Sequence, residues 1–192
     1  MKRKYIRNKN FCIGLGIVVF LFVMMFISLF YTPYPPDAMD TANAFAVPSA
    51  KHLLGTDNFG RDILSRLMTG SQTAFFVGIG AVTIGLSAGL LLGSVSGYFG
   101  GWIDEIVMRL MAFPGVILAL VLITVFGSGA LNTAIALGIM SIPKFCRVTR
   151  SGFMQIKQLE YIKAARSRGA SRFRIMVLHI LPNISSSLIV TA

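Results

Sequence analysis

The sequence is poor in charge, and above all in acidic residues. Charged residues make up 13% of its 192 positions, with 7 Asp and Glu against 18 Lys and Arg, while apolar residues reach 55%. A water-soluble domain needs more charge than this to cover its surface. The composition therefore excludes an ordinary soluble domain and predicts a chain that lies in a bilayer.

Three further absences narrow the class. Two cysteines are too few for a disulfide framework. The sequence lacks a GxxxxGK[ST] phosphate loop, so we expect no ATP hydrolysis by that chemistry and no bound cofactor. The long apolar runs carry no charge at their centres, which leaves a proton or ion relay without residues. We therefore predict no catalytic residues and a chain that is not an enzyme.

The basic residues gather in two clusters beside apolar segments. This pattern is typical of cytoplasmic loops and predicts a cytoplasmic N-terminus, whereas the high pI alone would have suggested nucleic-acid binding. The first ten positions hold Lys2, Arg3, Lys4, Arg7 and Lys9, and the second cluster comprises Lys144, Arg147, Arg150, Lys157, Lys163, Arg166, Arg168, Arg172 and Arg174.

The apolar runs predict an all-α, polytopic transmembrane helical bundle. Residues 11–31 contain no charge and would form a helix of about 31 Å, enough to cross the hydrocarbon core. A cleaved signal peptide is the alternative, but the small residues at 44–46 lie far beyond the run. We predict a cytoplasmic tail at 1–10 and a permease-like membrane domain at 11–192, with spans at about 11–31, 74–98, 110–126 and 130–143 and the start of a fifth at 183–192.

Two connecting segments and the end of the chain complete the outline. Residues 31–73 are polar and rich in turns, which suits the outer side, and helical spacing at 63–68 predicts a short amphipathic helix there. Residues 99–109 are expected to form a short inside turn. The fifth apolar stretch has ten residues, too few to cross, so we expect a fragment or a truncated product.

Glycines recur every four residues in the second predicted span. They place one stripe on a helix face, where a neighbouring backbone can approach closely. Static close packing and a wall that slides during transport both explain such a stripe. Its members are Gly85, Gly89, Gly93 and Gly97, with Gly101 in the same register.

The basic segment 144–182 contains a predicted helix–turn–helix, residues 155–182, which we call the elbow. Gly169 is expected to end its first helix and Ser171 to cap the second. A bent, base-rich element with small residues at its corner fits either a groove on a protein or an anionic membrane surface. The predicted apolar faces are Ile156, Leu159, Ile162, Ala164 and Ala165 on the first helix, and Phe173, Met176, Val177 and Ile180 on the second.

Two stretches resemble the permease subunits of ABC importers, in the dipeptide, oligopeptide and nickel branch. The elbow is similar to their EAA motif, although Lys163 stands where the motif has its glutamate. Residues 52–67 resemble the segment before the second span of the C-type subunits. The matching elbow residues are Glu160, Lys163, Ala164, Ala165, Gly169, Ala170, Ser171, Leu181 and Pro182, and those of the outer segment are Gly55, Thr56, Asp57, Gly60, Arg61 and Asp62.

The resemblance implies a type I importer permease in a bacterial inner membrane. Its partners would be a homologous permease subunit, two ATPase subunits at the elbows, an extracytoplasmic substrate-binding protein and membrane lipid, with no nucleic acid. ATP would be used by the ATPase, and the cargo would be peptides or nickel-type ligands. An ion-coupled secondary transporter or channel, and a membrane scaffold, are the alternatives.

Three side chains in the outer segment are of types that bind metal ions. His52, Asp57 and Asp62 could hold a metal ion, but arginines four residues after each acid offer Asp57–Arg61 and Asp62–Arg66 pairs instead. We therefore expect hydrogen-bonded structure there and no metal ligands.

Overall fold

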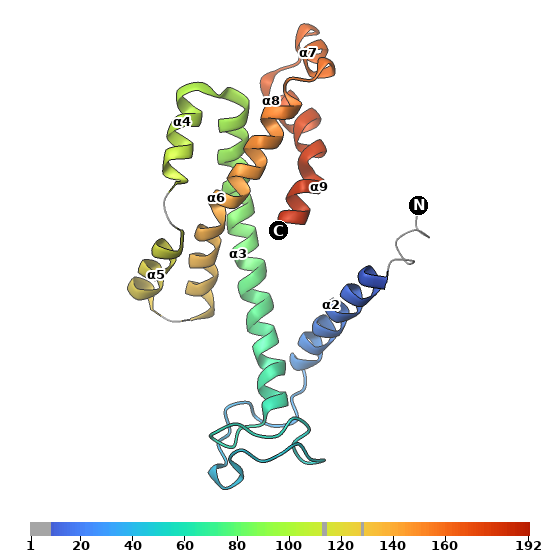
Figure 1. Ribbon diagram of the computed structural model, residues 1–192, viewed down its shortest axis with the longest axis vertical. Coiled ribbons are helices and arrows are strands. Elements are labelled where there is room, and N and C mark those ends of the chain that lie inside the picture. The colour runs from blue at the N-terminus through green and yellow to red at the C-terminus, as the bar shows by residue number, and fades with distance from the viewer. Residues whose placement is uncertain (1–8, 113–114, 128) are drawn as a thin grey trace. The chain divides into compact units, whose positions relative to one another are not determined.

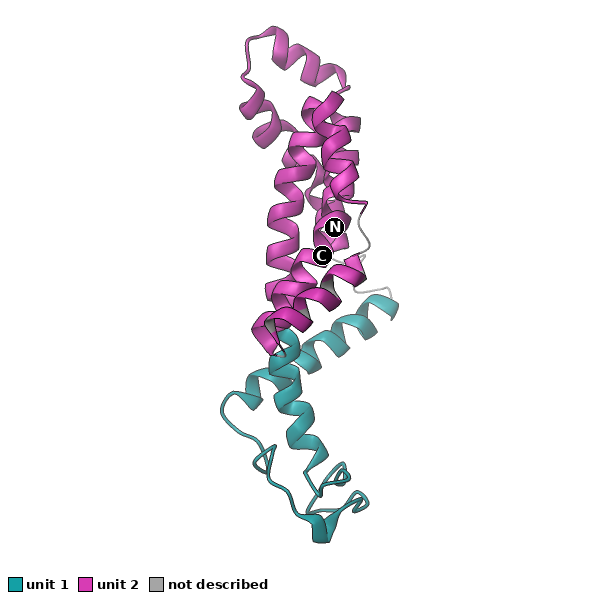
Figure 2. Ribbon diagram, turned by 90° about the vertical axis from the view of Figure 1, so that its left-hand side faces the viewer, with its two compact units in different colours: residues 1–76 teal, residues 77–192 magenta. Residues whose placement is uncertain are grey.

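The computed structural model describes residues 9–112, 115–127 and 129–192. The chain forms two compact units, residues 1–76 and 77–192 (Figure 2). Within the described ranges the regular elements are helical, apart from an isolated antiparallel bridge between Thr56 and Asp62. The predicted all-α fold is confirmed. Most of the predicted basic tail (1–8), residues 113–114 of the third predicted span and residue 128 lie outside the described residues.

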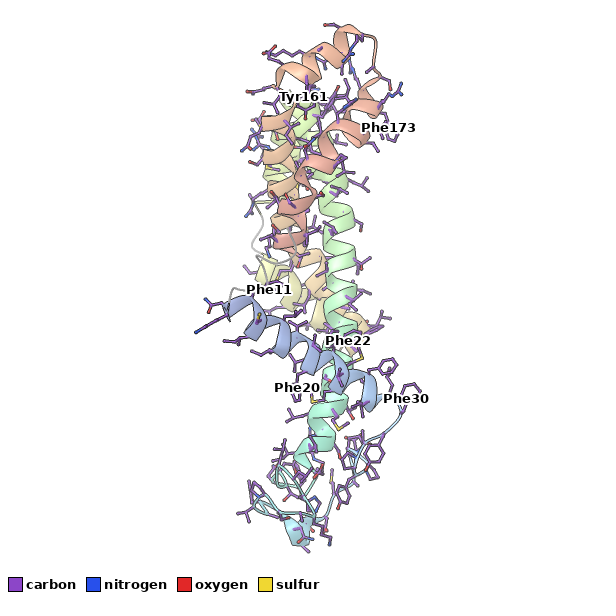
Figure 3. All side chains as sticks on the ribbon, turned by 90° about the vertical axis from the view of Figure 1, so that its right-hand side faces the viewer. Phe11, Phe20, Phe22, Phe30, Tyr161 and Phe173 are labelled. Atoms are coloured by element: carbon purple, nitrogen blue, oxygen red, sulfur yellow. The ribbon has the colours of Figure 1, made fainter. Side chains whose placement is uncertain are left out.

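The first unit begins with α2 (Lys9–Ser28), whose length and apolar composition suit a membrane span. Figure 3 shows Phe11, Phe20 and Phe22 along this helix, and all three are exposed. The rings of Phe22 and Phe75 lie 5.8 Å apart, between centroids, in an edge-on contact. The amide of Gln72 donates a hydrogen bond to the Ser28 hydroxyl at 2.7 Å, so the end of α2 packs on the first turns of the next long helix.

That helix, α3 (Ile63–Phe99), is 37 residues long. At about 1.5 Å per residue it extends about 55 Å, well beyond a hydrocarbon core of about 30 Å. The prediction of a separate amphipathic helix at 63–68 was wrong, because the helix continues without a break into the predicted span. The linking residues 69–73 hold one glycine and no proline, and one glycine costs a helix only about 1 kcal/mol.

A two-glycine turn separates α3 from α4 (Gly101–Leu110). Gly100 and Gly101 have φ of +69° and +58°, a left-handed conformation that glycine adopts without steric cost. The predicted inside turn at 99–109 is therefore wrong over most of its length. Asp104 in the first turn of α4 and Arg109 in the last turn complement the helix dipole and favour the helical state.

Two helices, α5 (Gly115–Phe126) and α6 (Ala130–Ile156), follow and pack against each other. The prediction that α6 ends at Pro143 was wrong, since the helix continues to Ile156. A proline removes one backbone donor, and packing of the surrounding turns can hold the helix together. Phe145 and Cys146, directly after the proline, are buried. The first third of the predicted loop 144–182 is therefore the end of α6.

The glycine stripe of α3 faces α6, which runs beside it in the same direction (Figure 1). A Cβ atom added at any of its four members would lie 2.5–2.8 Å from an atom of α6, closer than such atoms approach in proteins. Gly101, in the same sequence register, has nothing within 4 Å of its Cβ position and begins α4 instead. The close-packed members are Gly85, Gly89, Gly93 and Gly97.

After α6 the chain forms α7 (Glu160–Ser167), α8 (Arg172–Arg174), the π-helical segment η2 (Ile175–Ile180) and α9 (Leu181–Thr191). The last three follow one another as a single helical path of 20 residues, long and apolar enough to span a membrane. The stretch at 183–192 was predicted to be too short to cross a membrane. Its helical path begins earlier, at Arg172, and is therefore longer than the apolar run suggested. With α2 and α3, three helices of the described chain meet this criterion.

Candidate functional site

The corner of the elbow is a helix end followed at once by a helix start. Gly169 has φ +83°, and its N–H and that of Ala170 donate to carbonyls of the last turns of α7 at 2.9 and 3.1 Å. This pair of bonds is a Schellman motif, which satisfies the last carbonyls of a helix around a left-handed glycine. The Ser171 hydroxyl then accepts the N–H of Arg174 at 3.3 Å and caps α8. The bend is therefore built by local hydrogen bonds.

The second arm of the elbow consists of α8 and η2. The side chains that it buries differ in part from the predicted apolar face. Ile180, which was predicted for the apolar face, is buried, and so is Ile175, which was not; Phe173, also predicted for that face, is 75% exposed. The reason is the π-helical segment, in which residues five apart come onto one face. The 3.6-residue period used for the prediction could not place Ile175 there. Ile184 and Leu188 continue the buried row into α9.

The first arm of the elbow is α7, and its two adjacent alanines differ in exposure. Ile162 and Ala165 are buried, and Ile162 packs with Ile175 and Ile180 of the second arm. Ala164 is exposed. Gly169 is also exposed, and no atom lies within 4 Å of its Cβ position. The open part of the corner therefore consists of Ala164 and Gly169, whereas enlarging Ala165 would disturb the elbow itself.

The two arms of the elbow carry exposed apolar and basic side chains. Tyr161 and Phe173 lie on its two arms (Figure 3), and both are exposed. The other exposed apolar side chains are Leu159, Val177 and Leu178, and the exposed bases are Lys163, Arg166, Arg168, Arg172 and Arg174. Lys163 pairs with Glu160, the one acid in residues 155–182, at 2.7 Å. The surface is thus strongly basic, with apolar contacts interleaved.

The entry into α9 holds the last two predicted elbow residues. Leu181 and Pro182 are the first residues of α9, which continues directly from η2. Pro182 lacks a backbone N–H, so it removes one donor where η2 passes into α9. Asn183 donates to the carbonyl of His179 at 2.6 Å and to the Tyr161 hydroxyl at 3.3 Å. The two arms of the elbow are therefore joined at this end as well.

Tyr98 and Lys157, which the sequence gave no reason to single out, attach the elbow to the end of α3. The Lys157 ammonium donates to the carbonyl oxygens of Gly97 and Tyr98 at 2.7 and 3.4 Å. Arg166 donates to the Tyr98 hydroxyl at 3.3 Å, and the Tyr98 side chain packs with buried Ile162. A polar hollow of about 770 Å³ lies beside these contacts.

The outer segment forms a hydrogen-bonded loop in the first unit. Gly55 and Gly60 have φ of +77° and +75°, and a Cβ atom at Gly60 would come 1.7 Å from the Asp40 carbonyl oxygen. The Thr56 hydroxyl donates to the Asn43 carbonyl at 2.5 Å and accepts an N–H from the same turn. Gly55, Thr56 and Gly60 are therefore required by the shape of the loop.

Asp57 is the charged centre of this loop. Its carboxylate accepts bonds from the N–H groups of Phe59 and Arg61, and from the side chains of Arg61 at 2.8 Å and Arg66 at 2.5 Å. Partial desolvation alone would raise the pKa of Asp57, but these donors hold it well below its usual range. The predicted Asp57–Arg61 pair is present, and Arg66 joins it.

Asp62 caps α3 and is almost completely buried. It accepts the N–H and the hydroxyl of Ser65, each at 2.8 Å, and lies 3.0 Å from His52 Nδ1. Burial acts to raise the pKa of Asp62, and the bonds from Ser65 and His52 lower it below the ordinary value. The predicted pair with Arg66 was therefore wrong, because Asp62 faces His52 instead. The described residues include no cluster of three His, Cys, Asp or Glu that could hold a metal ion.

Comparisons with known proteins match this architecture. Residues 85–192, which contain the glycine stripe and the elbow, match the model of a family described as binding-protein-dependent transport system inner membrane component. Residues 1–48 match the N-terminal TM domain of oligopeptide transport permease C. The predicted resemblance to C-type permeases of the peptide branch is confirmed.

Curated relatives align over nearly the whole chain. A glutathione transport system permease protein GsiD from Pectobacterium atrosepticum is 38% identical over 98% of this chain and 64% of its own length. GsiD from Escherichia coli is 42% identical over 90% of the chain and 59% of its own length. A dipeptide transport system permease protein DppC from Alkalihalophilus pseudofirmus is 35% identical over 97% and 62%.

The chain thus spans about three fifths of the length of these relatives. All three are transport permeases by name, and the matched family consists of inner membrane components. The helical architecture, the elbow and these matches lead to one conclusion: the chain belongs to the binding-protein-dependent transport system inner membrane component family, in the peptide-permease branch.

Proposed function

We propose that this chain forms part of the translocation path of an ATP-driven importer and binds a separate ATPase through the elbow. Family membership favours this function over an ion-coupled secondary transporter or channel. The observation that carries the proposal is the open corner at Ala164 and Gly169, on an elbow whose arms carry exposed apolar and basic side chains. Small residues let a partner approach the backbone, apolar side chains anchor it, and bases attract an acidic rim.

Peptides are the proposed cargo. The relatives described above are named for glutathione and dipeptides, which favours peptides over nickel-type ligands. A homologous permease subunit would complete the path, and a substrate-binding protein would deliver cargo on the outer side. The N-terminus and the elbow would face the cytoplasm, because both are rich in Lys and Arg.

The elbow lies at the right place to transmit movement. Its first arm packs on Tyr98 at the end of α3, and its second arm continues directly into α9. Rigid helices that leave a docking element can convert the closure of two ATPase subunits into alternating access. The glycine stripe between α3 and α6 would be the contact that either stays rigid or slides during this step.

The substitution Ala164→Leu tests the docking. Leu has nearly the same helix propensity as Ala, and Ala164 is exposed, so α7 should remain folded. We expect the complex to lose its ATPase during co-purification, because the larger side chain occupies the open corner. Ser151→Leu, at an exposed position of α6 before the elbow, is the matched control and should retain the ATPase. Equal retention by both variants would contradict the proposed docking site.

A further inference from the structure

An ion pair joins α4 to α6 close to the elbow. Arg150 donates from Nε to one oxygen of the Asp104 carboxylate at 2.5 Å and from Nη2 to the other at 2.6 Å. The Ser96 hydroxyl, from α3, donates to the same carboxylate, and Ser96 is fully buried. One carboxylate therefore holds three helices together.

The Asp104–Arg150 pair is less exposed than the Glu105–Arg109 pair, which lies within α4. The side chains of Asp104 and Arg150 are 18% and 29% exposed, whereas those of Glu105 and Arg109 are 62% and 77% exposed. The hydrogen bonds from Arg150 are the largest influence on Asp104 and lower its pKa to about 2. Asp104 therefore stays ionised at neutral pH, and the two-pronged geometry fixes the orientation of α4 on α6.

The same end of α6 carries the elbow. Lys157 is the C-cap residue that follows Ile156, the last residue of α6. It donates to the last carbonyls of α3, where the helix dipole favours a cation. Arg150 lies two helical turns before it, so a displacement of the elbow reaches Arg150 through one continuous helix. Asp104 lies on α4, so the pair joins this helix to α6.

We infer that Asp104 and Arg150 link the elbow to α4, so that movement of α6 repositions this helix during each transport cycle. The inference rests on the proposed function and assigns positioning residues to its coupling step. A charged pair suits this role because it is directional and holds two helices in a fixed register. Apolar packing of similar area would join them without fixing that orientation.

The test uses the full permease complex, reconstituted in vesicles with its ATPase and binding protein, and measures substrate taken up per ATP hydrolysed. Asp104→Asn should keep the ATPase bound and hydrolysing while this ratio falls by about tenfold or more, as when one partner of a partly buried charge pair is removed. Glu105→Gln, in the exposed pair of the same helix, should leave the ratio unchanged. The double variant Asp104→Arg with Arg150→Asp should recover part of the loss.

The outcomes separate this inference from the proposed function. Normal coupling in Asp104→Asn would overturn the link, and so would a parallel loss of uptake and of bound ATPase, which indicates a structural role alone. If Asp104→Asn does not fold, the double variant decides, since a folded double variant with uncoupled hydrolysis also overturns the inference. Absence of ATPase from the unsubstituted complex would overturn the proposed function itself.

Discussion

An alanine at Gly93 would place a methyl group inside the contact between α3 and α6. Its Cβ would lie 2.5 Å from the Cys146 carbonyl oxygen and 2.7 Å from Thr149 Cβ, both on α6. Cys146 and Thr149 are fully buried, so neither can move aside alone and the helices must separate. Overpacking of this kind costs about 1–3 kcal/mol.

Gly78 offers a matched control on the same helix. Nothing lies within 4 Å of its Cβ position, so Gly78→Ala adds no clash. Both substitutions remove the entropic cost of a helical glycine, about 0.5–1 kcal/mol, so this gain cancels when the two variants are compared. They should therefore differ in stability by the overpacking cost alone, about 1–3 kcal/mol. For a chain of this size, the Tm of Gly93→Ala should lie about 2–12 °C below that of Gly78→Ala.

Labelling of the Cys146 thiol measures the same opening directly. In a Cys12→Ser background, a thiol reagent reaches Cys146 only when α3 and α6 separate, since its side chain is buried. A difference of about 1–3 kcal/mol predicts labelling about fivefold to a hundredfold faster in Gly93→Ala than in Gly78→Ala. Equal labelling rates and equal Tm values in the two variants would refute a tight glycine contact.

Three further predictions concern the outer loop and the elbow surface. Gly60→Ala should open the loop to proteases, because its Cβ would overlap the Asp40 carbonyl, while Gly70→Ala should not. Asp57 and Asp62 have folded pKa values below the unfolded value of about 3.9, so their contribution is present above about pH 4 and is lost as pH falls through the folded values. The protection factors of the loop amides in hydrogen exchange should accordingly stay high from pH 7 to about pH 5 and fall below about pH 4. Lys163→Ala should change Tm little, because an exposed pair contributes about 0–1 kcal/mol, and a clear drop would contradict its peripheral placement.

The sequence predicted those features that depend on local chemistry. Gly169 and Ser171 end and start helices by backbone hydrogen bonds within a few residues, so residue type alone indicated the bend. The four-residue repeat from Gly85 to Gly97 predicted a close helix contact, because repetition on one face needs no knowledge of the partner. Family motifs then identified the branch.

Features that depend on tertiary context escaped the sequence. Pro143 suggested a helix end, but packing of Phe145 and Cys146 carries α6 through it. The π-helical segment moves Ile175 onto the buried face and leaves Phe173 exposed, which a regular period cannot reveal. The partner of Asp104 lies 46 positions away, and no spacing rule selects Arg150 among the nine bases of that region.

The proposed docking of an ATPase at the elbow is tested most directly by cross-linking from one position. A cysteine in place of Ala164, in the Cys12→Ser background, would carry a short thiol-reactive photo-cross-linker in the assembled transporter. The account predicts a covalent product with the ATPase subunit from this position. It predicts none from a cysteine in place of Phe30, which follows the C-terminal end of α2 and adjoins the segment proposed for the outer side. Cross-links from position 164 to lipid, with none to the ATPase, would contradict it.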